Sequence, residues 1–224
     1  MSGAIDSLGA RLRSVQEKIA DAATAVNRDP SEITLIVVTK FHPSSLIRDL
    51  AALGVRDIGE NRHPEAGNKF DELSDLDLTW HFIGQLQTKK ARQVARYADV
   101  IHGIDRVGLV DALSPIERRI DCFVQVNLTS DPGRGGVQPL EMPQLIERVI
   151  ETPSLNLRGL MAVAPLDEEP RSAFARLREL SELATTIAPG ATDISAGMTG
   201  DFVDAIAEGA THLRIGTAIT GNRP

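Results

Sequence analysis

A chain of 224 residues with 42% hydrophobic and 25% charged side chains is long enough to bury a substantial core and has an ordinary globular composition. Its net charge of −7 excludes a broad electrostatic footprint for nucleic acid or an anionic membrane, and we expect neither as a partner. The lone cysteine, Cys122, excludes an internal disulfide, and no segment approaches the roughly 20 apolar residues of a membrane span, so we expect a cytoplasmic protein.

The predicted elements begin with a long amphipathic helix and then alternate between strands and helices. Apolar residues spaced three or four apart over 5–27, from Ile5 to Val26, predict the first helix. Short β-rich runs predict strands over 33–39, 56–59, 79–83, 99–102, 121–127, 157–163, 192–195 and 211–215. Helices are predicted between these strands, over 44–53, 62–74, 87–97, 106–119, 138–151, 170–187 and 200–208.

Strict alternation of strands and helices implies a parallel sheet with helical crossovers. Eight strands is the number that closes a TIM-type barrel, so we predict an α/β protein with a (β/α)8 barrel; an open doubly wound sheet is the alternative. Because the chain ends soon after the eighth strand, we expect no eighth helix. The helix over 5–27 should then pack on that part of the barrel wall, and residues 1–224 should form a single domain.

In such barrels the residues that carry chemistry lie at the carboxyl ends of the strands. The first strand ends at Lys40. The loops after strands seven and eight, which commonly form phosphate sites, are SAGMTGD (195–201) and RIGT (214–217). They offer glycine backbones, the hydroxyls of Thr199 and Thr217, and the N–H groups of a helix start near residue 200. We interpret them as a candidate phosphate site, although short Gly/Thr loops also occur as plain turns.

A lysine and a phosphate site on one rim fit two chemistries. One is a sugar-phosphate aldolase with a Schiff-base lysine, and the other is pyridoxal 5′-phosphate (PLP), held by its phosphate and by an imine. Both need an unprotonated amine, and burial near Arg214 would lower the pKa of Lys40. Opposite a pyridine nitrogen Arg214 could only donate a hydrogen bond, which leaves the ring a weaker electron sink. The structural alternatives are a rim ion pair for Arg214 and a solvated cation for Lys40.

Two further residues have simple structural explanations. His81 lies in the apolar strand segment WHF, where a histidine is more often a hydrogen-bonded core residue than a catalyst. Met161 is more often a packing residue than a ligand contact. No pair of histidines has the spacing of metal ligands, so we predict no metal site.

Several motifs together resemble one family. In chain order they are VVTKFHP, IGEN, WHFIGQLQTKK, GLMAV, SAGMTGD and AIAEGATHLRIGTAITG, which extend from about residue 33 to 221. This combination resembles the pyridoxal-phosphate homeostasis proteins of the YggS/PROSC type, which are similar to the barrel domain of alanine racemase. The resemblance implies a modified TIM barrel that binds PLP.

The resemblance also implies roles for individual residues. Lys40 would hold PLP as a Schiff base, Arg214 would face the pyridine nitrogen, and His81 would line the pocket. The full set of cofactor-binding residues implied in this way is Lys40, Asn61, His81, Met161, Ser195, Met198, Thr199, Arg214, Gly216 and Thr217. The chain departs from the family pattern at Lys89, Arg134 and Thr220, and the first two bear on a secondary anion site.

The same resemblance favours a carrier over an enzyme. The related racemases need a second base, a tyrosine from an additional β-domain, whereas the single tyrosine here, Tyr97, lies in a predicted helix. We expect a PLP carrier that acts in PLP homeostasis, has no firmly assigned reaction and is a monomer, with PLP-dependent apoenzymes as candidate partners. A PLP-dependent racemase or lyase of low activity stays open, as does, more remotely, the aldolase.

Overall fold

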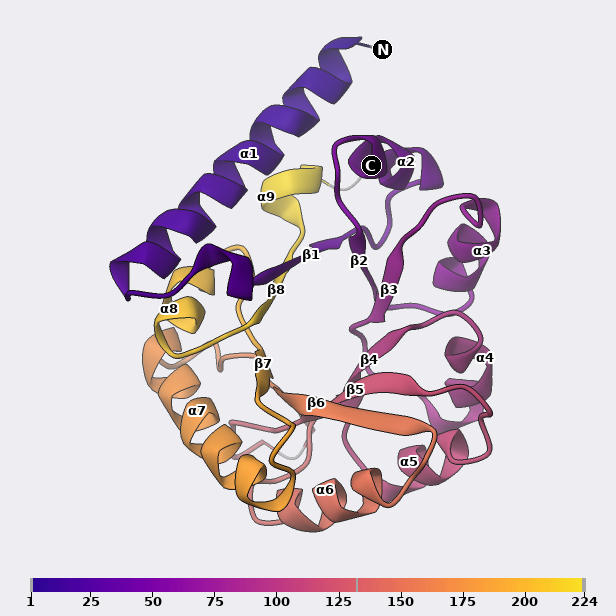
Figure 1. The fold of residues 1–224 in the computed structure, drawn as a ribbon, viewed down its shortest axis with the longest axis vertical. Coiled ribbons are helices and arrows are strands. Elements are labelled where there is room, and N and C mark those ends of the chain that lie inside the picture. The colour runs from indigo at the N-terminus through magenta and orange to yellow at the C-terminus, as the bar shows by residue number, and fades with distance from the viewer. Residues whose placement is uncertain (1, 132, 223–224) are drawn as a thin grey trace.

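Eight parallel strands close into a barrel in the computed structural model of the chain, which describes residues 2–131 and 133–222 (Figure 1). Strands pair in chain order and the last pairs with the first, with Ile36 opposite Arg214. The strands are β1 (Thr34–Val38), β2 (Asp57–Glu60), β3 (Thr79–Phe82), β4 (Val100–Ile104), β5 (Ile120–Gln125), β6 (Leu155–Met161), β7 (Asp193–Ser195) and β8 (His212–Ile215). The predicted barrel is confirmed, and the open sheet is wrong.

A ring of helices surrounds the barrel (Figure 1). Its members are α2 (Ser44–Ala52), α3 (Glu65–Glu72), α4 (Ala91–Ala95), α5 (Val107–Leu113), α6 (Met142–Ile150), α7 (Pro170–Ile187) and α8 (Phe202–Ala207), with short 3-10 turns η1 (Pro30–Glu32) and η2 (Thr88–Lys90). Helix α5 ends at Leu113, before the predicted residue 119, because Pro115 has no N–H group to donate to the Asp111 carbonyl oxygen. None of the helices in the described ranges has the length and apolar character that crossing a bilayer demands.

The expectation that no helix follows the eighth strand is wrong. A single turn, α9 (Thr217–Thr220), follows β8, and the long first helix, α1 (Ser2–Ala25), lies against α9 and α8 (Figure 1). Two arginines join these elements. Arg11 Nε donates to the Ile219 carbonyl oxygen (2.7 Å), and Arg28 Nη1 donates to the carbonyl oxygens of Ile206 (3.0 Å) and Ala210 (2.8 Å). The first helix therefore covers the part of the wall where only one helical turn is present.

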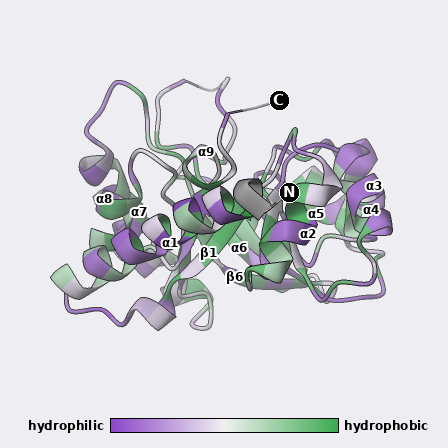
Figure 2. Cartoon of the chain, turned by 90° about the horizontal axis from the view of Figure 1, so that it is seen from above, coloured by the Kyte–Doolittle hydropathy of each residue, from purple (hydrophilic) through white to green (hydrophobic). Residues whose placement is uncertain are grey.

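Buried aliphatic side chains fill the outer layer, which we define as the space between the barrel wall and the helices. Ile47 and Leu50 of α2 and Leu177 of α7 have no exposed surface, and all three belong to one continuous cluster. In Figure 2 the hydrophobic segments lie at the centre of the molecule, whereas α3 and α7 carry hydrophilic residues at the periphery. Burial of this apolar area is the main force that holds the helices to the barrel.

The interior of the barrel has a different composition. Its apolar side chains include a small separate cluster of Val100, Phe123 and Met161. His102 of β4 stacks on Phe123 with ring centroids 4.6 Å apart, and Phe123 lies 5.1 Å from the ring of His212 on β8. Strands β5 and β8 are not neighbours, so these rings meet across the inside of the barrel. The interior therefore combines histidine rings with aromatic and aliphatic side chains.

Candidate functional site

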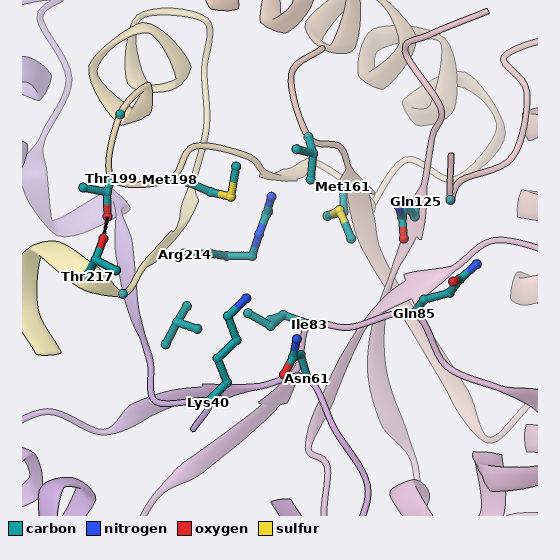
Figure 3. A pocket seen from close by; sticks show the side chains of 15 residues that line it. Lys40, Asn61, Ile83, Gln85, Gln125, Met161, Met198, Thr199, Arg214 and Thr217 are labelled. Carbon is teal, nitrogen blue, oxygen red and sulfur yellow. Dashed lines mark hydrogen bonds between the residues drawn. The ribbon is translucent and has the colours of Figure 1, made fainter. Parts of the chain in front are cut away.

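A cavity of about 500 Å³ opens at the carboxyl ends of the strands (Figure 3). Eight of the ten expected cofactor residues line it: Lys40, Asn61, Met161, Met198, Thr199, Arg214, Gly216 and Thr217. They come from β1, β2, β6, β7 and β8 or from the loops that follow them, so the closure of the barrel is what assembles them. The other two expected residues, His81 and Ser195, are buried outside this lining.

Lys40 lies two residues after the end of β1 and extends its side chain into the cavity (Figure 3). Two side chains of α3 hold the backbone on either side of it. Lys69 Nζ donates to the carbonyl oxygen of Thr39 (3.1 Å), and Glu65 Oε1 accepts from the N–H of Phe41 (2.9 Å). Phe41 has φ of 69°, a left-handed conformation that costs a non-glycine residue about 1–3 kcal/mol. The α3 contacts therefore stabilise a strained turn that directs Lys40 inward.

The same lysine of α3 belongs to a buried ion pair. Lys69 is 6% exposed and Glu60, at the end of β2, is 1% exposed. Glu60 Oε1 accepts from Lys69 Nζ and from Thr39 Oγ1, both at 2.7 Å. Burial raises the pKa of Glu60, and the hydrogen bonds and charge of Lys69 oppose that rise. Within the described residues the second oxygen, Oε2, has no partner, so the pair depends on Lys69 for its compensation.

The loop after β7 and the start of α9 face each other across one end of the cavity. Thr217 Oγ1 donates to Thr199 Oγ1 at 3.5 Å, and both side chains are exposed at the rim (Figure 3). Gly197 has φ of 92°, and a Cβ there would lie 2.8 Å from that of Ala205, so only glycine allows this turn. The two hydroxyls and the small residue Gly216 line this end of the cavity together, and a phosphate site there stays a prediction.

Arg214 of β8 provides a buried positive charge in the middle of the same cavity (Figure 3). It is 5% exposed, and its guanidinium donates from Nη1 to Ser195 Oγ (2.6 Å) and from Nη2 to the Ala162 carbonyl oxygen (2.9 Å). Burial lowers the pKa of Arg214 to about 10, so it stays protonated at neutral pH. The rim ion pair considered as an alternative is not present for this side chain among the described residues, because both acceptors are neutral.

His81 and Ser195 lie behind Arg214, away from the cavity surface. Ser195 has no exposed surface, and its Oγ lies 2.8 Å from His102 Nδ1 as well as 2.6 Å from Arg214 Nη1. His81 is 3% exposed and contacts His102 and Asp57. Neither side chain lines the cavity, so the expectation that both contact the cofactor directly is not met. Residues of a barrel strand that lie further from its carboxyl end fill a deeper layer of the interior.

Sequence reasoning missed several residues of the site. Gln85 and Gln125 line the end of the cavity opposite the two threonines (Figure 3). Gln125 could have been noticed as a polar residue that ends an otherwise apolar strand. The backbone of Gly84 packs closely against Asn61. A Cβ at Gly84 would lie 2.5 Å from the Asn61 carbonyl oxygen, so this contact requires glycine. The pairing of Glu65 with Lys69 was visible only as helical spacing of four residues.

The three departures from the family pattern lie elsewhere. Lys89 is exposed on η2 and lines none of the described cavities, whereas Arg134 lines a smaller cavity of about 270 Å³ that shares Gln125 with the main one. Thr220 is buried in α9. Tyr97, the single tyrosine, is 2% exposed and stacks on His63. It is therefore not a group of the cavity.

The arrangement brings together an amine, a guanidinium and paired hydroxyls around one enclosed space. An amine condenses with an aldehyde or ketone, hydroxyls and backbone N–H groups bind a phosphate, and a guanidinium donates to a neutral or anionic acceptor. No cluster of His, Cys, Asp and Glu suitable for a metal ion occurs within residues 2–131 and 133–222. The site is therefore suited to a compound that carries both a carbonyl and a phosphate.

Comparison with known proteins places this barrel in a class. Residues 11–224 match the family model described as the alanine racemase N-terminal domain. Alanine racemase from Corynebacterium glutamicum superposes with a TM-score of 0.76 at 15% identity, covering 98% of this chain and 61% of the racemase. Fold and site therefore define a barrel of the alanine racemase N-terminal-domain class.

Two closer relatives resolve the family. A protein of Pseudomonas aeruginosa named pyridoxal phosphate homeostasis protein is 37% identical over 225 residues, which are 98% of this chain and 97% of the relative. PipY of Synechococcus elongatus, solved with PLP bound, superposes with a TM-score of 0.82 at 33% identity, covering 96% of this chain and all of PipY. The chain belongs to the pyridoxal phosphate homeostasis protein family.

Proposed function

We propose that this chain binds PLP in the cavity at the carboxyl end of the barrel and acts in PLP homeostasis. The observation that carries the proposal is that one cavity of about 500 Å³ contains Lys40, Arg214 and the Thr199–Thr217 pair. These groups match the aldehyde, the pyridine ring and the phosphate of PLP in number and in chemical type. The PLP bound to PipY supports the same assignment.

Each residue of the site has one role in this proposal. Lys40 Nζ would hold the cofactor through its aldehyde carbon, as a Schiff base formed with release of one water molecule. Thr199, Thr217 and the backbone of Gly216 hold the phosphate, and Asn61 lies beside Lys40 on the same wall (Figure 3). Met161 and Met198 supply apolar contact area. When bound, the cofactor supplies an aldehyde and an electron-poor ring.

The position of Arg214 favours a carrier over a catalyst. Because its guanidinium stays protonated, it can donate a hydrogen bond to the ring nitrogen but does not release a proton to it. A ring that stays unprotonated withdraws electrons less strongly. The second proton-transfer group that a racemase needs is also missing from the cavity lining in the described residues, since Tyr97 is buried elsewhere. We therefore propose that the chain holds PLP without turning over amino acids.

The partners follow from this role. A protein that stores PLP without consuming it must receive the cofactor and release it, and PLP-dependent apoenzymes are the class of protein that takes it up. We propose that such apoenzymes are its partners and that it acts as a monomer. Sedimentation of the purified chain with and without PLP measures the second point.

The test is an absorbance titration with PLP, followed by borohydride reduction and mass spectrometry. The unchanged chain should develop a visible band and, after reduction, carry one PLP on the peptide that contains Lys40. Lys40→Ala should lose the band and the covalent label yet retain weaker binding through the phosphate contacts. Lys89→Ala, which removes an exposed lysine outside the cavity, is the control and should behave like the unchanged chain.

Two outcomes would contradict the proposal. A protein that takes up no PLP would exclude the function, and a label that persists in Lys40→Ala would exclude the assigned lysine. The alternatives have separate signatures in the same experiment. Formation of D-alanine from L-alanine would identify a racemase, and borohydride trapping of a sugar phosphate in the absence of PLP would identify an aldolase.

A further inference from the structure

A chain of hydrogen bonds crosses the interior of the barrel from Arg214 to Asp57. Arg214 Nη1 lies 2.6 Å from Ser195 Oγ, which lies 2.8 Å from His102 Nδ1. His102 Nε2 lies 3.0 Å from His81 Nδ1, and His81 Nε2 lies 2.9 Å from Asp57 Oδ1. Asp57 is the first residue of β2, so this donor chain runs from the cavity to the opposite end of the barrel.

The chemistry at the two ends sets the direction of every hydrogen bond between them. A guanidinium only donates, so Ser195 Oγ accepts from Arg214. Among the described residues the partners of Ser195 Oγ are Arg214 Nη1 and His102 Nδ1, so the Ser195 hydroxyl donates to His102 Nδ1. His102 then donates from Nε2 to His81 Nδ1, and His81 donates from Nε2 to Asp57, since a carboxylate only accepts. All four bonds therefore point from Arg214 towards Asp57.

Burial keeps the middle of this chain neutral. His102 has no exposed surface, and its pKa lies well below the ordinary value because of burial and of the positive charges that His81, Arg214 and His212 would place around it. The groups that face it are these three side chains, the Ser195 hydroxyl and the ring of Phe123. None of them is an anion, so His102 has no compensation for a charge. A neutral histidine has one donor and one acceptor nitrogen, so it passes the direction of one hydrogen bond on to the next.

The arrangement does more than satisfy buried polar atoms. A guanidinium without a fixed acceptor can rotate, whereas Arg214 is held by two acceptors, Ser195 at the end of β7 and Ala162 just after β6. The acceptor strength of Ser195 depends on how strongly its own proton is drawn towards His102, because hydrogen bonds in a row polarise one another. Arg214 also lines the cavity, so the same guanidinium borders the space in which a ligand would lie (Figure 3).

We propose that Asp57, His81 and His102, acting through Ser195, are positioning residues whose one-way donor chain holds the Arg214 guanidinium in the orientation that meets the ring nitrogen of the bound cofactor. Only the contact with the ring nitrogen rests on the proposed function. The donor chain itself is a property of the protein without a ligand. The test therefore has one readout that needs no PLP and one that does.

The readout without PLP is the tautomeric state of the two histidines. In the protein labelled with 15N at histidine, long-range 1H–15N spectra at neutral pH should show both His81 and His102 as neutral rings protonated at Nε2. Asp57→Asn should mix the tautomers, since an amide can accept or donate. Asp57→Glu keeps a carboxylate and should restore the Nε2–H form.

The readout with PLP is its affinity and absorbance. Ser195→Ala removes the acceptor next to Arg214 and should weaken PLP binding roughly tenfold, the effect of losing one hydrogen bond to a charged group. It should also shift the absorption maximum, because hydrogen bonding at the ring nitrogen tunes the ring. His212→Gln is the matched control. His212 lies beside His102 but bonds to Thr211, so this variant should change neither the tautomers nor the maximum.

The outcomes separate the two proposals. A His102 protonated at Nδ1, or a His81 protonated at both nitrogens, would overturn the donor chain whether or not PLP binds. Unchanged affinity and absorbance in Ser195→Ala, with the expected tautomers present, would overturn the positioning role. A protein that shows both expected tautomers but binds no PLP would exclude the proposed function and leave the donor chain supported.

Discussion

The outer layer and the interior of this barrel differ in the polarity of their side chains. The outer layer is aliphatic, with Ile47, Leu50 and Leu177 fully buried between strands and helices. The interior is lined by imidazoles, a guanidinium and hydroxyls that hydrogen-bond across the barrel. TIM barrels are usually filled by layers of branched aliphatic side chains. Here the outer layer supplies most of the apolar burial, and the interior can therefore hold polar groups that serve the cavity.

One ion pair breaks this division, because Glu60 and Lys69 are buried in the outer layer. We expect Lys69→Met to reduce the free energy of unfolding by about 3–5 kcal/mol, since it leaves the Glu60 carboxylate buried without its partner. Urea denaturation followed by circular dichroism measures the loss. The double variant Lys69→Met/Glu60→Gln removes both charges and should recover a large part of it. Equal losses in the single and double variants would show that the charge of Glu60 is not the cause.

A cavity in the outer layer tests whether stability and binding are separable. Leu50→Ala should lower the free energy of unfolding by about 3 kcal/mol, since Leu50 is fully buried in α2 against the barrel wall. The affinity for PLP should stay within about twofold of the unchanged chain, because Leu50 does not line the cavity and a ΔΔG below about 0.5 kcal/mol is expected there. A parallel loss of stability and affinity would contradict the division between layer and interior.

Acidification should destabilise the interior specifically. Burial lowers the pKa of His212 from 6.5 to about 4, so below pH 6.5 the unfolded chain binds a proton that the folded chain excludes. Stability is then complete above pH 6.5 and falls as the pH approaches 4. At pH 4.5 the loss from this residue is on the order of 2 kcal/mol relative to pH 7. Urea denaturation at both pH values should show a smaller loss for His212→Gln; an identical loss would rule out His212.

The smallest effect on stability is expected from the most polar interior residue. Arg214→Met should change the free energy of unfolding by no more than about 1 kcal/mol, because the removal of a desolvated cation offsets its two lost hydrogen bonds. The same variant should bind PLP much more weakly. Denaturation and PLP titration on one preparation compare the two effects. A loss of stability as large as that of Leu50→Ala would show that Arg214 contributes to the stability of the fold as much as a buried residue of the outer layer.

The alternation of short strand-like runs and helical segments was enough to predict the barrel, because strict β/α alternation implies a parallel sheet and eight strands close it. The positions of Lys40, Thr199 and Thr217 followed from the rule that strand ends meet at one rim. The sequence did not indicate how far below the rim of the barrel a strand residue lies. For this reason Ser195 and His81 were expected at the cavity. Depth depends on barrel register, which pairs residues far apart in the chain.

The contacts that steer Lys40 were also beyond the sequence. Glu65 and Lys69 look like an ordinary exposed pair at helical spacing, and only the packing of α3 against the end of β1 turns them towards the backbone of Thr39 and Phe41. The last turn, α9, was missed for a similar reason. Four residues are too few for a periodic pattern, and its packing against α1 is what completes it.

The cavity has a buried inner end and a solvent-exposed outer end, and this difference in exposure bears on how a ligand would leave it. Arg214 is 5% exposed, whereas Thr199 and Thr217 lie at the solvent-facing rim. A ligand whose phosphate sits between the threonines presents that group to the outside while its ring is still enclosed. In the proposed binding mode, the phosphate is therefore the part of the cofactor that a recipient protein would contact first.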